Sequence, residues 1–134
     1  MKVYAASKLA GEYFIRAIHE RHFIIRTCGL YAIAGSSGKG GNFIEMMLRL
    51  ASEGKEIRDF CYWYEFAAAT FEMAGLHPWL QETTSAAFGA RATRPAYSVL
   101  DNARLRSLGL DDLRHLRDAL KDYLSDRKQV TKEA

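Results

Sequence analysis

The spacing of apolar residues predicts a helix followed by a short buried strand at the start of the chain. Residues 4 to about 20 place apolar side chains at loosely helical spacing and end in the polar run HERH at 19–22. The next five residues, FIIRT at 23–27, are short, apolar and β-branched. That composition is typical of a parallel strand buried between helices, so the pattern favours an α/β fold.

Glycines and a capping pair set the limits of the next helix. The run GSSGKGG at 35–41 is too rich in glycine to hold regular structure. Asn42 and Glu45 are three residues apart, as an N-cap and its capping-box partner are. We therefore expect a helix from Asn42 to about Ser52, ended by Gly54.

The second half of the chain is predicted to be helical with little sheet. A helix is expected over 62–74, ended by Gly75, and 81–92 is expected to be a loop with one short strand at most. Pro95 imposes extended backbone on Arg94.

Two helices are expected toward the C-terminus. Asp101 is expected to cap a short helix that ends at Gly109, and Asp111 or Asp112 to start another. Beyond Ser125 the sequence predicts a charged, frayed tail. An apolar stripe on the last helix is expected to be core: Leu113, Leu116, Leu120, Tyr123 and Leu124.

Composition limits the classes of function. The chain has 134 residues, of which 49% are hydrophobic and 26% charged, as in an ordinary globular domain. A net charge of +3 with interspersed signs is too small for a nucleic-acid-binding surface, although it suits a diphosphate-bearing ligand. No stretch of 18 apolar residues and no signal segment are visible, so we expect no membrane insertion and a cytoplasmic protein.

The cysteines and histidines do not predict a metal site. Cys28 and Cys61 show neither a disulfide framework nor C-x-x-C spacing, so we expect buried free thiols. The four histidines form no metal-ligand spacing with these cysteines. They are His19, His22, His77 and His115.

The candidate chemistry begins with Tyr4 and Lys8. Their spacing of four residues places both on one face of a helix. An ammonium group beside a phenol favours the phenolate, which suits proton transfer to a carbonyl oxygen at neutral pH. Taken alone, Y-x-x-x-K is a weak signal, and a packed tyrosine with a solvated lysine is its default interpretation.

Several further motifs change that interpretation. YAASKLAGE at 4–12, IRT at 25–27 and GKGGNF at 38–43 resemble the dTDP-4-dehydrorhamnose reductase family. WYEFA at 63–67 and RATRPAYSVLDN at 91–102 resemble the C-terminal part of that family, in the same order. The similarity runs from residue 3 to about 124 and is therefore far more specific than one motif.

The resemblance implies an extended short-chain dehydrogenase/reductase. The implied fold class is α/β, a fragment of a Rossmann-type NAD(P)-binding fold with a helical and mixed substrate-binding portion. Family members use NADPH or NADH to reduce the 4-keto group of a nucleotide-linked deoxysugar, a step of dTDP-rhamnose biosynthesis. By resemblance Tyr4 donates the proton, while Lys8 tunes Tyr4 and holds the nicotinamide ribose.

The resemblance also implies two missing parts. The family reaches its catalytic tyrosine after several βαβ units and a glycine-rich pyrophosphate-binding turn, so we expect a C-terminal part without the N-terminal Rossmann half. Cofactor binding is doubtful without that half. The family pattern continues with strands and a helix before W-Y-E-F-A, so we expect an internal deletion near Arg58 and Asp59. The resulting units are 1–58, 59–124 and a tail at 125–134.

Substrate-side residues follow from the same resemblance. Asn42 is expected at the start of a helix near the nucleotide-sugar, and Arg94 to face the ligand, because guanidinium groups bind diphosphates in bidentate fashion. Arg91 is a weaker candidate. Without the resemblance, Asn42 is a helix cap beside a surface loop. Gly29 stands where family members often have a tryptophan, so the sugar pocket is expected to differ.

Other functions stay open on the sequence. The chain fits a non-catalytic nucleotide-sugar-binding or regulatory module, associated as a homo-oligomer or with another protein through surface left exposed by truncation. An epimerase or dehydratase shares Y-x-x-x-K but fits RPAYSVLDN at 94–102 less well. We expect impaired catalysis by this chain alone.

Overall fold

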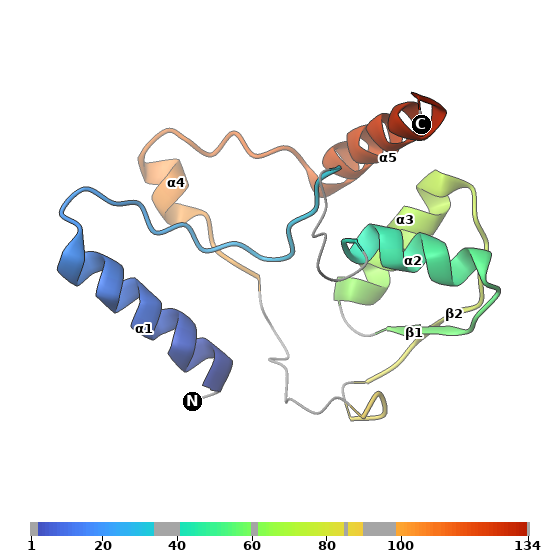
Figure 1. The fold of residues 1–134 in the computed structure, drawn as a ribbon, viewed down its shortest axis with the longest axis horizontal. Coiled ribbons are helices and arrows are strands. Elements are labelled where there is room, and N and C mark those ends of the chain that lie inside the picture. Colours follow the sequence, from blue (N-terminus) through green and yellow to red (C-terminus); the bar gives the residue numbers. More distant parts are fainter. Residues whose placement is uncertain (1–2, 34–40, 60–61, 85, 90–98, 134) are drawn as a thin grey trace.

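A computed structural model describes residues 3–33, 41–59, 62–84, 86–89 and 99–133 (Figure 1). Helices alternate with two short strands, and the predicted α/β class is confirmed. In chain order the elements are α1 (Val3–Ile18), α2 (Phe43–Ser52), β1 (Ile57–Asp59), α3 (Tyr62–Ala74), β2 (Leu80–Glu82), α4 (Ala103–Ser107) and α5 (Leu116–Glu133).

Apart from α4 and the segments that flank it, the molecule has two parts that differ in packing (Figure 1). The elements α2, α3, α5, β1 and β2 gather together, and we call them the core lobe. The helix α1 and residues 19–28 extend away from that lobe, and residues 29–33 pack against it. We call α1 and residues 19–33 together the arm. Every hydrophobic residue that is buried belongs to the core lobe, and α1 has none, within the described ranges.

The helix α2 forms as its sequence predicts. Asn42 is the N-cap, and its Oδ1 accepts a hydrogen bond from the backbone N–H of Glu45 at 3.2 Å. Gly54 follows the helix with a φ of +64°, a conformation that glycine adopts without steric cost. The buried face of α2 consists of Ile44, Met47 and Leu48, spaced at one helical turn.

The helix α3 connects the two strands into a parallel β-α-β unit. Its bounds and its end at Gly75, where φ is +69°, are those that the sequence predicts. The two strands pair in register, with Ile57 opposite Leu80 and Asp59 opposite Glu82. The face of α3 that carries Ala67 and Phe71 covers Met47 and Ile57 to form one hydrophobic cluster.

A second hydrophobic cluster joins α2, α3 and α5. Ile44 and Leu120 are fully buried in it, together with Phe66 and the apolar part of Tyr123. The hydroxyl of the buried Thr70 donates to the carbonyl oxygen of Phe66 at 2.8 Å, so it is satisfied inside the helix. These contacts attach α5 to the unit formed by the two strands and α3.

The prediction of a buried strand at 23–27 is wrong. These residues lie outside every strand of the structure, and the side chains of Phe23 and Ile25 are 95% and 81% exposed. A parallel strand needs a neighbouring strand to bond its backbone, and the described part of the chain places none beside 23–27. The apolar sequence suits a buried strand, but the described residues hold no strand beside it with which it could pair.

The C-terminal predictions need three corrections. The short helix has Asn102 at its N-cap, and the carboxylate of Asp101 pairs with Arg106 at 2.6 Å instead. The last helix starts at Leu116, after the two aspartates expected to begin it, and continues through Glu133, so the charged segment is helical. Leu113 and Leu116 are exposed, because the packed face of α5 begins only at Leu120.

Cys28 is exposed, which contradicts the predicted buried thiol. Residues 34–40, which hold most of the glycine-rich loop, lie outside the described residues, as do Cys61 and residues 90–98. In the part that the structure describes, no helix is long and apolar enough to cross a membrane.

Candidate functional site

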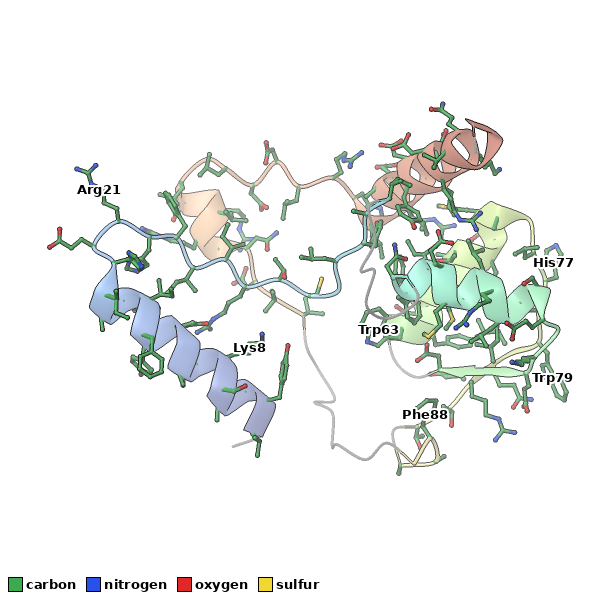
Figure 2. All side chains as sticks on the ribbon, viewed as in Figure 1. Lys8, Arg21, Trp63, His77, Trp79 and Phe88 are labelled. Atoms are coloured by element: carbon green, nitrogen blue, oxygen red, sulfur yellow. The ribbon has the colours of Figure 1, made fainter. Side chains whose placement is uncertain are left out.

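Tyr4 and Lys8 lie side by side in the first two turns of α1. The Lys8 Nζ is 5.5 Å from the centroid of the Tyr4 ring, which is within the range of a cation–π contact. The side chain of Tyr4 is 74% exposed, and Figure 2 shows Lys8 on the arm, away from the core lobe. The predicted shared face therefore exists, and both groups are open to a ligand.

A bidentate ion pair fixes α1 against the extended segment that follows it. Arg26 donates from Nε to Glu12 Oε1 and from Nη2 to Glu12 Oε2, both at 2.7 Å. The hydrogen bonds from Arg26 lower the pKa of the Glu12 carboxyl, and the same bonds raise the pKa of Arg26. Arg16 lies 3.8 Å from the same carboxylate. This pairing joins α1 to the extended segment that follows it.

Asn42 is the centre of a polar network at the start of α2. Its Nδ2 donates to the hydroxyl oxygen of Tyr123 at 2.9 Å and to the carbonyl oxygen of Ala32 at 3.2 Å. Because its Oδ1 caps the helix, one side chain joins the end of the arm, α2 and α5. The predicted capping role is confirmed, whereas a contact with substrate stays a prediction.

Glu45 accepts the other bonds of this network. Tyr123 donates its hydroxyl to Glu45 Oε1 at 2.8 Å, and Arg127 Nε donates to the same oxygen at 2.7 Å. Partial burial raises the pKa of Glu45, but the hydrogen bonds from Arg127 and Tyr123 outweigh it and hold the net pKa below the ordinary value of 4.5. The carboxylate is therefore ionised at neutral pH.

The Trp63 indole lies against Gly29, the position where the resemblance predicts a tryptophan in other family members. An ideal Cβ at Gly29 would lie 2.6 Å from the Trp63 Cη2 atom, so the indole occupies the space of a side chain there. Phe43 packs against Trp63 with a centroid separation of 4.6 Å. Trp63 is thus a packing residue in this structure, while Trp79 is exposed.

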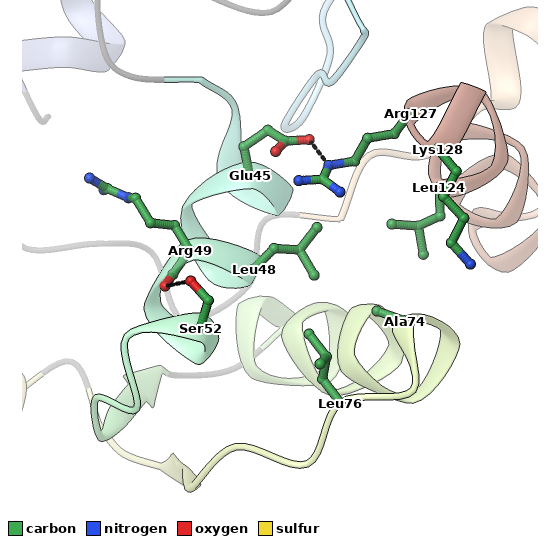
Figure 3. Close-up of a pocket in the computed structure, with 9 residues that line it drawn as sticks. All are labelled: Glu45, Leu48, Arg49, Ser52, Ala74, Leu76, Leu124, Arg127 and Lys128. Atoms are coloured by element: carbon green, nitrogen blue, oxygen red, sulfur yellow. Dashed lines mark hydrogen bonds and ion pairs between the residues drawn. The ribbon is translucent and has the colours of Figure 1, made fainter. Parts of the chain in front are cut away.

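Among the described residues, pockets on or beside the core lobe include two that contain neither Tyr4 nor Lys8. One, of about 420 Å³, lies between α2, the end of α3 and α5 (Figure 3). Its lining combines Leu48, Leu76 and Leu124 with basic groups at Arg49, Arg127 and Lys128. Figure 3 shows that Arg127 is directed toward Glu45 and is therefore already paired.

The second pocket, of about 620 Å³, lies between residues 29–33 and α5. Tyr31 and Tyr123 form part of its wall, with their ring centroids 5.3 Å apart in an edge-to-face arrangement. An ion pair between Arg114 and Asp122 lies at its rim. This pocket adjoins Gly29 and the polar network of Asn42.

The structure brings together only part of the predicted site. Tyr4 and Lys8 are on the arm, Asn42 is in the core lobe, and Arg94 and Arg91 lie outside the described residues. Sequence reasoning did not find the roles of Tyr123 and Arg127. A signal existed, because these two residues are four apart and therefore share one face of α5.

No group of three or more metal-binding side chains is assembled in the described ranges. The candidate residues for chemistry in the described ranges are Tyr4 and Lys8, which share one face of α1.

Comparisons with known proteins identify the family. The model of the RmlD substrate binding domain matches residues 1–60 and 58–129, which is most of the chain, so the chain belongs to this family. The match occurs in two pieces that meet at 58–60. This is the arrangement expected if the chain lacks an internal family segment near Arg58 and Asp59.

Individual relatives agree with the family. The chain is 32% identical to the spore coat polysaccharide biosynthesis protein SpsK of Bacillus subtilis (strain 168) over 163 positions, covering 96% of this chain and 56% of SpsK. That alignment is longer than the chain, so SpsK has positions without a counterpart here. A dTDP-4-dehydrorhamnose reductase of Streptomyces griseus is 46% identical over 59 residues, which are 43% of this chain and 19% of the reductase.

A solved structure extends the agreement to three dimensions. It is the dTDP-4-dehydrorhamnose reductase of Bacillus anthracis str. Ames in complex with NADP. The TM-score is 0.81 at 28% identity, covering 92% of this chain and 55% of that chain. The chain thus spans little more than half the length of SpsK and of this reductase.

Proposed function

We propose that this chain provides the proton-donating and substrate-binding part of a reductase that acts on the 4-keto group of a nucleotide-linked deoxysugar, a step of dTDP-rhamnose biosynthesis. The observation that carries the proposal is the exposed pair of Tyr4 and Lys8 on one face of α1, in a member of a family whose named relatives include such reductases. The proposed cofactor is NADPH or NADH, because a reductase relative was solved with NADP.

The residues present fit one end of such a cofactor. Lys8 has three N–H donors in the open beside Tyr4, so it would bind the nicotinamide ribose hydroxyls. When bound, the cofactor supplies a hydride to the carbonyl carbon. Tyr4 gives the proton from its hydroxyl to the carbonyl oxygen, so the ketone becomes an alcohol. A glycine-rich turn for the diphosphate is not found in these 134 residues, so we expect weak cofactor binding and low turnover.

The substrate side of the proposal uses Asn42 and Arg94. Asn42 is fixed by three hydrogen bonds at the start of α2, and Arg94 would bind the diphosphate of the nucleotide-sugar. Replacing Arg94 with methionine is therefore expected to weaken binding of dTDP about tenfold or more by calorimetry. Unchanged binding by the Arg94→Met chain would remove Arg94 from the site.

The catalytic proposal is tested by oxidation of NADPH with a dTDP-4-keto-6-deoxysugar. We expect turnover well below about 1 s⁻¹, and a further loss of about 10²–10⁴-fold in Tyr4→Phe. Tyr13 is an exposed tyrosine on the same helix, so Tyr13→Phe is the matched control and should leave the rate unchanged. Equal rates in both variants would refute the role of Tyr4, and ordinary turnover would refute the expected impairment.

A non-catalytic nucleotide-sugar-binding or regulatory module is the second candidate. The exposed apolar residues of the arm favour it, because such a surface suits a part that works in association. Thermal melts distinguish the two functions, since a ligand at a hundred times its Kd stabilises by ~2.7 kcal/mol. A shift with dTDP but none with NADPH supports the module, and a shift with both supports the reductase.

A further inference from the structure

Lys8 lies midway between two side chains of α1 that are within its reach. Tyr4 is four residues before it and Glu12 is four residues after it, so each lies about one helical turn away. The Lys8 Nζ is 5.5 Å from the centroid of the Tyr4 ring. Among the described residues, Lys8 forms no ion pair with Glu12, whose carboxylate contacts two arginines instead. The ammonium group therefore lies beside the phenol and not beside the opposite charge.

The carboxylate of Glu12 is occupied on both oxygens. Arg26 donates to each oxygen at 2.7 Å, and Arg16 Nη2 lies 3.8 Å from Oε2. A bidentate guanidinium pair has a planar geometry that a lysine ammonium cannot reproduce. The side chain of Glu12 is 14% exposed, whereas those of Arg16 and Arg26 are 53% and 64% exposed. The carboxylate therefore has little open surface left for a third cation.

The pairing of Glu12 decides where the charge of Lys8 acts. Opposite charges four residues apart attract each other on a helix, so the local sequence of α1 favours a pair between Lys8 and Glu12. Such a pair would neutralise the ammonium and direct its N–H donors toward the C-terminal end of α1, away from Tyr4. Arg26 comes from the extended segment outside the helix, and it prevents this pair by binding the carboxylate first.

We infer that Arg26, assisted by Arg16, is a positioning residue for the proposed reaction. By occupying the carboxylate of Glu12, the two arginines leave the ammonium of Lys8 free beside Tyr4. This inference rests on the proposed function, because it assigns the residues that keep Lys8 available for that reaction. It has a consequence that a purely structural ion pair lacks. Without the arginines, Glu12 itself disturbs the site, so removing Glu12 as well restores the site.

The test measures how fast Lys8 is acylated in the full chain. An opposite charge favours the protonated form of an amine, which is not a nucleophile, so an ion pair slows acylation. Each chain is treated with limiting acetic anhydride, and mass spectrometry of proteolytic peptides gives the acetylated fraction of each lysine. In Arg16→Met/Arg26→Met, Lys8 should react about twofold more slowly, which corresponds to one ion pair between residues four apart on a helix. Lys55, which pairs with Glu53, is the internal control and should keep its rate.

A third substitution separates positioning from structure. Adding Glu12→Gln to Arg16→Met/Arg26→Met removes the carboxylate, so the acylation rate of Lys8 should return to the wild-type value. Figure 2 shows Arg21 beyond the C-terminal end of α1, and Arg21→Met is the control for the loss of a positive charge from the arm. It should react as the wild type does. Equal rates in the wild type and the double variant would overturn the inference, as would a triple variant that is as slow as the double variant.

Positioning and catalysis fail separately in this design, because acylation involves no reduction. The KM for NADPH should follow the acylation rate, rising about twofold in the double variant and recovering in the triple variant. If Lys8 follows the expected order while Tyr4→Phe keeps its turnover, the proposed function is refuted, although the arginines still keep Lys8 unpaired. If Tyr4→Phe loses turnover while Lys8 reacts equally in all chains, the positioning role is refuted and the proposed function stands.

Discussion

The core lobe and the arm have comparable apolar sequences but opposite environments. Ile44 in α2 is 0% exposed, whereas Ile25 in the extended segment is 81% exposed. Both lie in runs that predict burial. Ile44 meets α3 and α5, while Ile25 meets no second layer within the described residues. Apolar pattern therefore predicts which residues can form a core, and the presence of a partner element decides which of them do.

The largest expected difference is between two isoleucines. Ile44→Ala leaves a cavity in the cluster of α2, α3 and α5 and should lower the free energy of unfolding by about 2–5 kcal/mol. Ile25→Ala removes the same atoms from an exposed position and should change the free energy of unfolding by less than about 0.5 kcal/mol. Urea unfolding followed by circular dichroism measures both. Similar losses in the two variants would mean that the arm is packed in solution.

Two glycines give the next contrast. Gly29→Ala places a methyl group against the Trp63 indole, so the ring must move, at a cost of about 1–3 kcal/mol. Gly11 has open space around it on α1. Gly11→Ala should raise the helix content there, because alanine is more favourable than glycine in a helix by about 1 kcal/mol. Thermal melts of the core and far-UV dichroism measure the two effects. An unchanged melting temperature in Gly29→Ala would show that Trp63 does not pack there.

The bond between Arg127 and Glu45 gives a smaller, pH-dependent effect. Arg127→Met should destabilise the core lobe by about 1 kcal/mol at pH 7, discounted because both groups are partly exposed. Glu45 has a lowered pKa in the folded state, so its stabilisation is present above the ordinary value of 4.5 and is lost as the pH falls through the folded pKa.

The difference in the free energy of unfolding between wild type and Arg127→Met should therefore shrink on acidification from pH 7 to a pH below the folded pKa of Glu45, where its carboxyl becomes protonated. Lys128→Met removes an equal charge one residue away and is the control. Urea titrations at the two pH values measure the difference. If Arg127→Met loses the same free energy of unfolding at both pH values, the aliphatic part of Arg127, rather than its charge, stabilises α5.

The smallest effect is expected at the ion pair of the arm. Glu12→Gln weakens the contact with Arg26, which is exposed and screened by salt. The melting temperature of the core lobe should therefore not change. Residues 19–33 should then be cleaved faster by trypsin, because α1 no longer holds them. Glu20→Gln is the control, since Glu20 forms no ion pair with the residues that the structure describes. Equal cleavage in both variants would mean that the pair does not order the arm.

Local physical chemistry was sufficient for α2 and α3 of the core lobe. Asn42 was predictable as a cap because its side chain is short and bonds a backbone N–H two or three residues away. The bounds of α3 were predictable because Gly75 ends the apolar run at a positive φ. Tyr4 and Lys8 share a face for the same reason, since four residues make about one helical turn.

Tertiary structure decided what depends on a partner. The segment at 23–27 has the composition of a strand, but a strand exists only where a second backbone bonds it. Leu113 continues the apolar stripe of Leu120 by sequence spacing, yet it is exposed because α5 begins only at Leu116 and its first buried residue is Leu120.

The polar network shows the same division. Sequence spacing identified Glu45 as a capping partner, but its carboxylate is bound by Tyr123 and Arg127, which are 78 and 82 residues away. A pattern of neighbouring residues cannot predict a contact between residues so far apart in the sequence. The sequence determined α2 and α3, the Asn42 cap and the shared face of Tyr4 and Lys8, because those depend on neighbouring residues. Only the tertiary structure decided which apolar faces are covered and which charges meet, because those depend on segments far apart in the chain.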